Sequence, residues 1–303
     1  MMKADYIWMN GKIVPFEEAN IHFLSPTMHY GIGAFEGIRC YETPEGAAVF
    51  RLREHIQRLL DSALILGVSE FPYSIDDLCQ ATFETIKANG FKGCYIRPLV
   101  YLDGPLGLDL DASVAKIGIA AWEWGTYLGD EALESGVHMM VSSFTRHHIN
   151  VSMTKAKISG NYVNSVLAKT LALRSGYDEA IMLDTNGYVS ECSGENLFVV
   201  NDQDIEPPPR ATILEGITRN SLVTIAKDSG YNITENLISR DQLYIADELF
   251  VCGTAAEVTP VRAVDHRTIG LGKPGPITKT IQQVFFDTVN GTGKRSKEWL
   301  EYV

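Results

Sequence analysis

Cysteine, basic charge and long apolar runs are all scarce in this sequence. Five cysteines are scattered among 303 residues without a CxxC pair, which excludes a disulfide scaffold and a cysteine-rich zinc site. Only 26 Lys and Arg face 38 Asp and Glu, and a net charge of −12 disfavours nucleic acid and anionic membranes as partners. No apolar run approaches the roughly 18 residues of a membrane span, and the N-terminal residues lack the apolar region of a signal peptide. These absences predict a reduced, cytoplasmic enzyme.

The motifs of several common enzyme classes are absent as well. There is no HExxH, GxSxG or Walker A string, and Gly31-Ile32-Gly33 lacks the third glycine of a dinucleotide-binding loop. His147 and His148 are adjacent, so they do not place two metal ligands on one face. These absences argue against a serine hydrolase, a P-loop enzyme and a Rossmann dehydrogenase, and no metal is expected.

The apolar residues that are present, 45% of the chain, suffice for one large domain or two ordinary ones. Residues 1–125 are predicted to form a small α+β domain. Its predicted elements are a hairpin about Asn10-Gly11, a single strand over 34–41, helices over 51–66 and 76–88, and strands over 94–102 and 116–122. Pro98 indicates that the strand over 94–102 lies at a sheet edge or meets a bulge. A glycine-rich stretch then predicts an interdomain loop over 126–136.

Residues 137–303 are predicted to form the larger domain. Its pattern indicates β structure over 137–144 and 151–157 and a hairpin about Asn186-Gly187. One helix is predicted to begin at Gly160 and another after Gly216. The core-facing residues expected on the first of these helices are Val163, Val166, Leu167, Thr170 and Leu171.

Two turns and two lysines are the candidates for chemistry. Gly216-Ile217-Thr218 opens a predicted helix, whose free N–H groups and dipole favour an anion, and Gly253-Thr254-Ala255-Ala256 follows a buried strand and could add donors. Arg58 could contribute a guanidinium. Lys157 could form an imine with a carbonyl cofactor if its pocket removed its proton, but spacing alone does not select Lys157 over Lys155.

Taken together, several strings resemble one enzyme family. Four of them resemble the fold type IV pyridoxal-phosphate enzymes: Lys157-Ile158-Ser159-Gly160-Asn161-Tyr162, the run from Tyr188 to Phe198, Gly216-Ile217-Thr218-Arg219 and Gly253-Thr254-Ala255-Ala256-Glu257. Three more resemble the branched-chain amino acid aminotransferases within that class: His29-Tyr30-Gly31, Phe35-Glu36-Gly37-Ile38-Arg39 and Tyr95-Ile96-Arg97-Pro98. The resemblance implies a two-domain α+β fold, in which a small α/β sandwich domain of residues 1–125 precedes a larger β-barrel-like domain of residues 137–303 that carries the lysine.

The resemblance also implies pyridoxal 5′-phosphate as cofactor. Lys157 would hold it as an imine and then act as general base and acid. Glu191 would face the pyridine nitrogen and keep it protonated. The remaining implied cofactor contacts are Arg58, Gly216, Ile217, Thr218, Gly253 and Thr254 at the phosphate, Tyr162 at the phenolic oxygen and Asn196 beside the ring.

The implied substrates are branched-chain L-amino acids and 2-oxoglutarate. Tyr95 would bind the α-carboxylate with the N–H groups of Thr254 and Ala255. Arg97, together with Tyr30 and Tyr127, would accept the distal carboxylate of glutamate. The implied lining of the apolar pocket is Phe35, Trp124, Tyr162 and, from a partner subunit, Tyr30 and Leu108. The resemblance thus implies a site between the domains that is completed in an obligate homodimer or a higher homo-oligomer.

Three alternatives remain open at this point. A D-amino-acid or (R)-amine transaminase shares the fold but is not expected to combine Tyr95, Arg97 and the Gly253–Glu257 run. An aminodeoxychorismate lyase shares Lys157 and Glu191 but needs no arginine for glutamate. A non-catalytic binding protein has no reason to keep Lys157, Glu191 and Arg58 together.

Overall fold

The chain forms two compact units in a computed structural model that describes residues 4–68, 70–125 and 127–303. Unit 1 comprises the described residues up to Trp124 together with Ala156–Asn161 and Thr288–Val303, and unit 2 comprises the described residues of 125–155 and Tyr162–Asp287. The division lies close to the predicted boundary at residue 125. It differs from the predicted domains because two segments of the range 137–303, including the one that carries Lys157, belong to unit 1.

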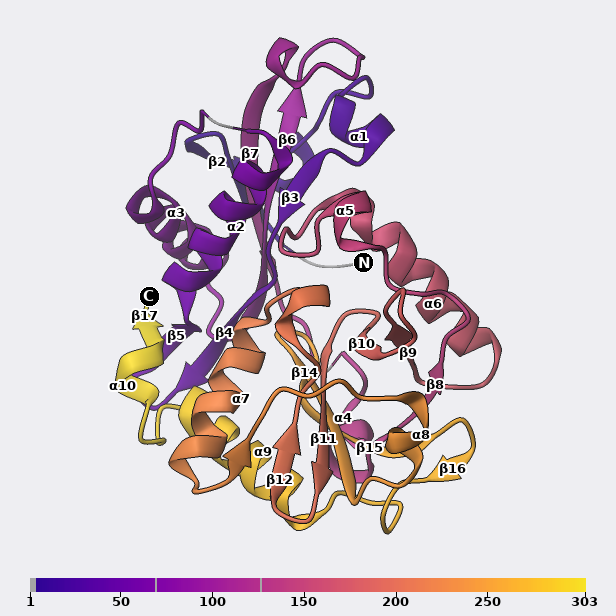
Figure 1. The fold of residues 1–303 in the computed structure, drawn as a ribbon. Helices are drawn as coiled ribbons and strands as arrows, with labels where there is room; N and C mark the ends of the chain where they lie inside the picture. The colour runs from indigo at the N-terminus through magenta and orange to yellow at the C-terminus, as the bar shows by residue number, and fades with distance from the viewer. Residues whose placement is uncertain (1–3, 69, 126) are drawn as a thin grey trace. The chain divides into compact units, whose positions relative to one another are not determined.

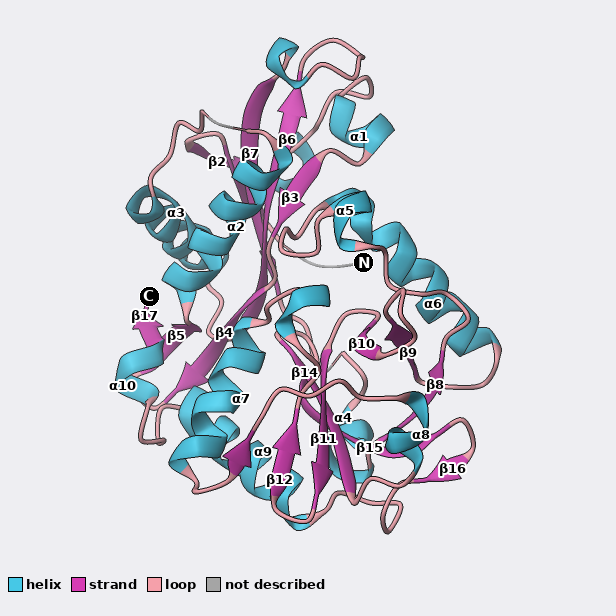
Figure 2. Cartoon of the chain, viewed as in Figure 1, coloured by secondary structure: helices cyan, strands magenta, loops and turns pink. Residues whose placement is uncertain are grey.

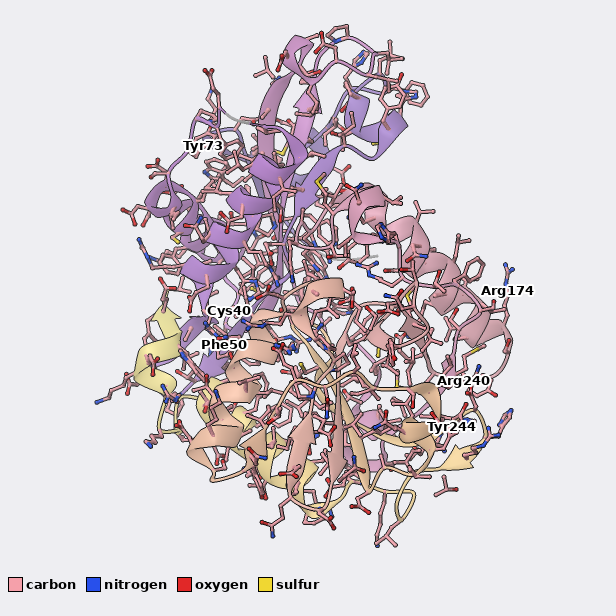
Figure 3. The ribbon with its side chains drawn as sticks, in the orientation of Figure 1. Cys40, Phe50, Tyr73, Arg174, Arg240 and Tyr244 are labelled. Atoms are coloured by element: carbon pink, nitrogen blue, oxygen red, sulfur yellow. The ribbon has the colours of Figure 1, made fainter. Side chains whose placement is uncertain are left out.

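Unit 1 is built on an antiparallel sheet with the strand order β17-β5-β4-β6-β7-β1-β2, in which β3 also pairs with β6 (Figure 1). Its strands are β1 (Tyr6–Met9), β2 (Lys12–Pro15), β3 (Gly33–Phe35), β4 (Ile38–Thr43), β5 (Gly46–Phe50), β6 (Cys94–Asp103), β7 (Val114–Trp122) and β17 (Leu300–Tyr302). The predicted hairpin about Asn10-Gly11 is confirmed as β1 and β2, with Met9 opposite Lys12. Cys40 on β4 and Phe50 on β5 are buried in this unit (Figure 3).

Two long helices, α2 (Leu52–Leu66) and α3 (Ile75–Asn89), pack against this sheet (Figure 2). Their bounds agree with the predicted helices within one residue at each end. On the apolar stripe of α2, Leu52, Ile56 and Leu59 are fully buried. Ser74 begins α3 with a capping box, in which its N–H donates to Asp77 Oδ2 at 2.8 Å. The short helices of the unit are α1 (Pro26–Tyr30) and α10 (Ser296–Trp299).

The strand predicted over 34–41 is interrupted at Glu36 and Gly37, so β3 and β4 are separate. Gly37 fits here because a Cβ atom at this position would lie 2.0 Å from the hydroxyl of Tyr95. Pro98 lies opposite the interruption: β3 pairs with residues 99–101 of β6, β4 pairs with residues 94–96, and Glu36 N–H donates to Pro98 O at 3.0 Å. Strand β6 is therefore interior, and its proline, which has no N–H to give, meets an irregularity rather than a sheet edge.

Unit 2 contains a mixed sheet with the strand order β10-β9-β8-β15-β14-β11-β12-β13, and β16 pairs with β15. The strands are β8 (Val137–Val141), β9 (Glu179–Leu183), β10 (Val189–Cys192), β11 (Asn196–Asn201), β12 (Asp204–Glu206), β13 (Asn232–Ile233), β14 (Glu248–Gly253), β15 (Glu257–Val264) and β16 (Arg267–Thr268). This curled sheet corresponds to the predicted larger β domain. Its helices are α4 (Asp130–Ser135), α5 (Ile149–Ser152), α6 (Tyr162–Arg174), α7 (Ile217–Asp228), α8 (Arg240–Tyr244) and most of α9 (Pro276–Val289).

Three local predictions for unit 2 differ from the structure. The predicted loop over 126–136 contains α4, and residue 126 lies outside the described residues. The segment predicted as β over 151–157 begins in α5 and continues without strand structure. On α6, the expected core residues Val163, Val166 and Leu167 are exposed, whereas Ser165, Ala168 and Ala172 are buried. Small side chains let α6 pack closely on β9, which leaves its larger apolar residues on the outside.

Candidate active site

Lys157 lies on a short segment that is anchored to unit 1 through its backbone. Its carbonyl accepts the N–H of Phe35 at 3.0 Å, and its own N–H donates to the hydroxyl of Ser62 on α2 at 3.0 Å. The next residue forms an isolated bridge with Ala34, and Gly160 N–H donates to Gly31 O at 3.0 Å. The lysine is therefore fixed on both sides of its Cα, although the chain before and after this segment belongs to unit 2.

The structure gives Lys157 and Lys155, between which the sequence did not choose, different surroundings. The ammonium of Lys155 is surrounded by oxygen atoms within unit 2: it lies 2.8 Å from Glu215 Oε1 and 3.4 Å from Ile213 O, and it also donates to Arg210 O. The Nζ atom of Lys157 instead lies 5.0 Å from the ring centroid of Phe35 in unit 1. Lys155 holds a loop in place, and Lys157 is the lysine that stands among the other candidate residues.

Those neighbours form an aromatic group in unit 1. The Arg97 guanidinium lies 4.8 Å from the Phe35 ring centroid and donates to the Tyr95 hydroxyl at 3.1 Å. The rings of Tyr95 and Trp124 meet edge to face at 4.7 Å. The Nε atom of Arg97 is buried without a hydrogen-bond partner, as is Nε1 of Trp122. Unpaired buried donors are costly, so this group offers donors to a ligand that carries an anionic or polar end.

A buried ion cluster, which the sequence analysis did not identify as a group, lies beside Lys157. Glu36 is fully buried, and its two carboxylate oxygens lie 2.7 and 2.9 Å from Nε and Nη2 of Arg58. The ring Nδ1 of His55 lies 2.7 Å from the same carboxylate. The sequence held no signal for this cluster, because its members are brought together by the interruption between β3 and β4 and by one face of α2.

In unit 2, Glu191 lies on β10 as a buried carboxylate that contacts Leu214, Asn196 and Arg146. Its Oε2 atom accepts the N–H of Leu214 at 3.1 Å and the amide of Asn196 at 3.3 Å. Its Oε1 atom lies 2.6 Å from Nε of Arg146, and both side chains of this ion pair are buried. Because the N–H of Arg146 is not directed at the oxygen, the contact is an ion pair rather than an aligned hydrogen bond. Arg146 was missed from the sequence, since nothing in its local pattern distinguishes it.

Two turns of unit 2 present backbone donors near Asn196. Helix α7 begins after Gly216 without a side-chain cap, and the N–H of the buried Thr218 in its first turn is a candidate donor to an anion. A Cβ atom on residue 216 would lie 2.2 Å from Asn196 Oδ1, which explains the glycine. The second turn, Thr254–Ala256, joins β14 to β15, and Asn196 pairs with Cys252 at the end of β14. Unit 2 thus combines backbone N–H groups that could bind an anion with the buried carboxylate of Glu191.

The remaining predicted residues are less closely grouped. Tyr162 begins α6 and is half-buried, and Tyr127 lies in unit 2 with its ring centroid 5.2 Å from Lys169 Nζ. Tyr30 and Leu108 of unit 1 are exposed, and Leu108 shows 87% of its surface. Ile217 is the first residue of α7, Gly253 is the last residue of β14, and Ala255 lies in the turn between β14 and β15. No helix in the part of the chain that the structure describes is long and apolar enough to cross a membrane.

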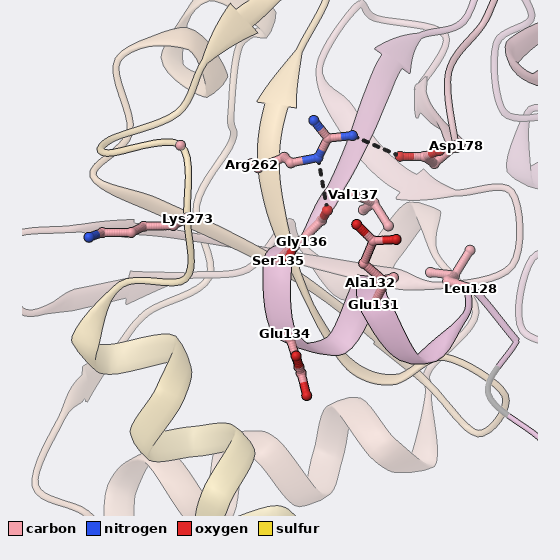
Figure 4. A pocket seen from close by; sticks show the side chains of 11 residues that line it. Leu128, Glu131, Ala132, Glu134, Ser135, Gly136, Val137, Asp178, Arg262 and Lys273 are labelled. Atoms are coloured by element: carbon pink, nitrogen blue, oxygen red, sulfur yellow. Dashed lines mark hydrogen bonds and ion pairs between the residues drawn. The ribbon is translucent and has the colours of Figure 1, made fainter.

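A pocket of about 510 Å³ lies elsewhere in unit 2, at the junction of α4 and β8 (Figure 4). Arg262 lines it, donates to Gly136 O at 3.0 Å and lies 3.7 Å from Asp178. None of the predicted site residues lines this pocket. Its lining includes neither Lys157 nor a buried carboxylate.

Comparison with known proteins identifies the family of the chain. The family model of the class IV aminotransferases matches residues 33–264. A relative from Pseudomonas aeruginosa, named branched-chain-amino-acid aminotransferase, is 49% identical over 299 residues, which cover 98% of this chain and 97% of the relative.

Solved structures extend the similarity to three dimensions. The branched-chain amino acid aminotransferase of Escherichia coli is 47% identical, with a TM-score of 0.96 and 99% of each chain covered. A second enzyme of the same name, from the organism abbreviated T.th. and solved with pyridoxamine 5′-phosphate, is 48% identical, with a TM-score of 0.96 over 100% of this chain and 99% of its own. This T.th. enzyme has also been solved with N-(5′-phosphopyridoxyl)-L-glutamate and with 4-methylvaleric acid. The family match and these full-length similarities show that the chain belongs to the class IV aminotransferases.

Proposed function

We propose that the chain transfers the amino group of branched-chain L-amino acids to 2-oxoglutarate, with pyridoxal 5′-phosphate as cofactor. The products are branched 2-oxo acids and L-glutamate. The observation that carries the proposal is the position of Lys157, whose backbone is fixed on unit 1 beside Phe35, Tyr95 and Arg97. A lysine, apolar rings and a carboxylate-binding arginine are what this reaction needs in one place.

The residues of each unit fit the cofactor. In unit 2, the N–H groups at the start of α7 and in the turn Thr254–Ala256 are donors for the phosphate, and the Glu191 carboxylate suits a protonated pyridine nitrogen. In unit 1, Arg58 adds a guanidinium for the phosphate. Tyr162 would donate to the phenolic oxygen, and Asn196 would lie beside the ring. The bound cofactor supplies the electron sink that stabilises negative charge at the substrate α-carbon.

The protein side chains perform the proton movements and hold the substrate. Lys157 Nζ would bind the cofactor, take the proton from the substrate α-carbon and return it later in the cycle. Arg146 keeps a positive charge beside Glu191, which favours the ionised carboxylate that the ring nitrogen requires. Tyr95, with the N–H groups of Thr254 and Ala255, would bind the substrate α-carboxylate.

Two substrate classes must use one pocket. Phe35, Trp124 and Tyr162 provide apolar surface for the side chains of leucine, isoleucine and valine. Arg97, with Tyr30 and Tyr127, would bind the distal carboxylate of glutamate and of 2-oxoglutarate. The ligands of the solved T.th. enzyme, a glutamate derivative and a branched aliphatic acid, support the same pair of substrate classes for this chain.

We also propose that the working form is a homodimer. The α6 residues Val163, Val166 and Leu167 are exposed in unit 2, and so are Phe23, Met28 and Leu108 in unit 1. Exposed apolar residues that share one face of a helix, as the spacing of the three on α6 implies, are typical of interaction surfaces. A second copy of the chain would cover them, and its Tyr30 and Leu108 would complete the substrate pocket. The cytoplasmic location stays a prediction.

A substrate panel with a visible spectrum tests the function. The purified protein with pyridoxal 5′-phosphate should show the absorbance of a lysine imine and should lose it when leucine, isoleucine, valine or glutamate converts the cofactor to its amine form. D-amino acids and primary amines should react far more slowly. Faster reaction with D-alanine or an (R)-amine, or release of pyruvate from aminodeoxychorismate, would replace the proposal by one of the alternative activities.

A further inference from the structure

The carboxylate of Glu36 is the most completely enclosed charged group of unit 1, and nothing in the proposed reaction uses it. It is fully buried at the interruption between β3 and β4. Its oxygens lie within 2.9 Å of two guanidinium nitrogens of Arg58 and 2.7 Å from His55 Nδ1, and the N–H of Gly37 donates to Oε2 at 3.2 Å. Burial alone would raise the pKa of Glu36, but the Arg58 guanidinium and the hydrogen bond from His55 hold this pKa well below its usual range. Glu36 is therefore an anion at neutral pH.

His55 contributes a hydrogen bond rather than a second charge. Burial lowers the pKa of His55 more strongly than the neighbouring Glu36 raises it, so the ring is neutral at neutral pH. A neutral ring that contacts the carboxylate through Nδ1 donates its single proton there. Glu36 then balances one cation, that of Arg58, and His55 fixes the orientation of the carboxylate.

The contact with Glu36 balances the charge of the Arg58 guanidinium and also fixes the direction in which this group points. Nε and Nη2 form one edge of the planar guanidinium, and both bind the carboxylate, so the plane and the direction of the group are fixed by Glu36. Because α2 fixes the backbone of Arg58, only the side-chain torsions remain, and the bidentate contact selects one combination of them.

The same contacts join Arg58 to Lys157 by two short routes. Lys157 N–H donates to Ser62 Oγ, and Ser62 Oγ donates to the backbone carbonyl of Arg58 at 2.7 Å. Lys157 O accepts the N–H of Phe35, and the next residue, Glu36, binds the Arg58 side chain. Lys157 and Arg58 are far apart in sequence, yet these two routes of hydrogen bonds within unit 1 fix their relative position.

We propose that Glu36 is a positioning residue, which aims the Arg58 guanidinium at the phosphate of the cofactor and ties that contact to the position of Lys157. The inference rests on the proposed function, because it assumes that Arg58 binds the phosphate. A role limited to stability is a poor explanation for the cluster, since well-packed apolar residues of similar volume often stabilise a core as well as a buried ion pair does. Apolar packing could not fix the direction of the Arg58 guanidinium in this way.

The test compares two ligands that differ only in the phosphate. The dissociation constants of pyridoxal 5′-phosphate and of pyridoxal are measured by equilibrium dialysis for the full-length wild-type chain and for Glu36→Gln. The variant is expected to raise the constant of the phosphorylated ligand about tenfold or more, as for a lost charge-assisted hydrogen bond, and that of pyridoxal less than about threefold. In an Arg58→Ala background, Glu36→Gln should no longer change the ratio of the two constants.

Two further variants keep the test decisive. Glu36→Asp replaces Glu36→Gln if that variant does not fold. It retains the charge, so it should lose less stability, but its side chain is too short for the bidentate contact. It should therefore also weaken the binding of pyridoxal 5′-phosphate more than that of pyridoxal. Glu248→Gln is the matched control, because Glu248 is also buried and accepts the N–H groups of Ile277 and Thr278 in unit 2. It should lower the melting temperature without changing the ratio.

Each result has a distinct meaning. Equal losses for the two ligands, or no loss for the phosphorylated one, would overturn the positioning role while the proposed function stands. A wild-type chain that binds pyridoxal 5′-phosphate no more tightly than pyridoxal would overturn the assignment of Arg58 to the phosphate, and the inference with it. A wild-type chain that binds neither ligand would overturn the proposed function.

Discussion

At the scale of single residues, Lys157 and Lys155 have the same side chain two positions apart but different surroundings. Lys157→Ala is expected to abolish amino transfer and the imine absorbance. In the part of the chain that the structure describes, the amine beside the Phe35 ring is that of Lys157. Lys155→Ala removes only the contacts to Glu215 and the loop about Arg210, so it should reduce stability slightly and keep the absorbance. Borohydride reduction followed by peptide mapping checks both. An adduct on Lys155 would contradict the assignment.

Arg97→Ala should separate the two half-reactions. Leucine has an apolar side chain, so the loss of the guanidinium beside Phe35 should change its reaction little. For 2-oxoglutarate the distal carboxylate loses a charge-assisted hydrogen bond worth about 1.5–3 kcal/mol, and kcat/KM should fall about 10- to 150-fold. Stopped-flow measurement of each half-reaction decides between the outcomes. Equal losses for both substrates would mean that Arg97 only supports Tyr95.

Glu195 should make the stability of unit 2 depend on pH. Burial raises the pKa of Glu195, the nearby Glu179 carboxylate raises it further, and Lys169 offsets part of the effect, so that the pKa is about 8. Because this folded pKa lies above the ordinary value of 4.5, the folded state binds the proton more tightly than the unfolded chain does. The stabilisation is complete below pH 4.5 and is lost as the pH rises through the raised folded pKa.

Glu195→Gln mimics the protonated form and should remove this dependence. Between pH 5 and pH 9 the melting temperature of the wild type should fall relative to that of the variant, by about 3 °C or more for a folded pKa of about 8. Differential scanning calorimetry across that range measures the difference. Parallel curves for the two proteins would show that Glu195 does not hold the proton.

At the scale of the elements, α6 shows where a hydrophobic pattern misleads. The stripe Val163, Val166 and Leu167 has the spacing of a core face, yet it is exposed, and the small residues Ser165, Ala168 and Ala172 are buried instead. Apolar spacing does not show what covers a helix face. A face that another subunit would cover therefore has the same pattern as a face that packs against the core. Arg174, at the end of the same helix, is exposed as well (Figure 3).

Val166→Asp should therefore weaken self-association. The variant removes a valine that the second copy would bury, which is worth about 1.5–3 kcal/mol. It also adds a charge that would lose water in each of two subunits, so the dimer dissociation constant should rise at least about 100-fold. Ile245→Asp is the control, because Ile245 is also exposed but lies directly after α8. Sedimentation velocity measures both. A dimer that persists in Val166→Asp would place the interface elsewhere.

Much of the local structure could be predicted from the sequence, because it depends on neighbours in the chain. The hairpin at Asn10-Gly11 and the helices α2 and α3 follow from turn chemistry and apolar spacing. The candidate lysine and the two turns proposed to bind the phosphate were found through sequence motifs. Glu36, His55 and Arg146 could not be found as partners in this way, because each acquires its function from a contact with a residue at least 19 positions away.

At the scale of the whole molecule, the order of the residues in the chain does not follow the division into units. A pattern of strands and helices locates the boundary near residue 125, but it does not reveal that six residues around Lys157 return to unit 1. That return depends on hydrogen bonds with Phe35, Ser62 and Gly31, which are tertiary contacts. The predicted domain that carries the lysine and the observed unit differ for this reason.

The pairing of β17 with β5 can form only at the end of the synthesis of the chain. It pairs with β5, so the edge of β5 stays open until residues 300–302 leave the ribosome. About 250 residues separate the two strands, and at ~5–20 residues per second this delay lasts roughly 12–50 s. During that time the nascent sheet exposes an unpaired edge, the kind of surface on which chains aggregate. Cells that overproduce this protein should therefore depend on chaperones that bind nascent chains, and a version that ends before β17 should accumulate as aggregates.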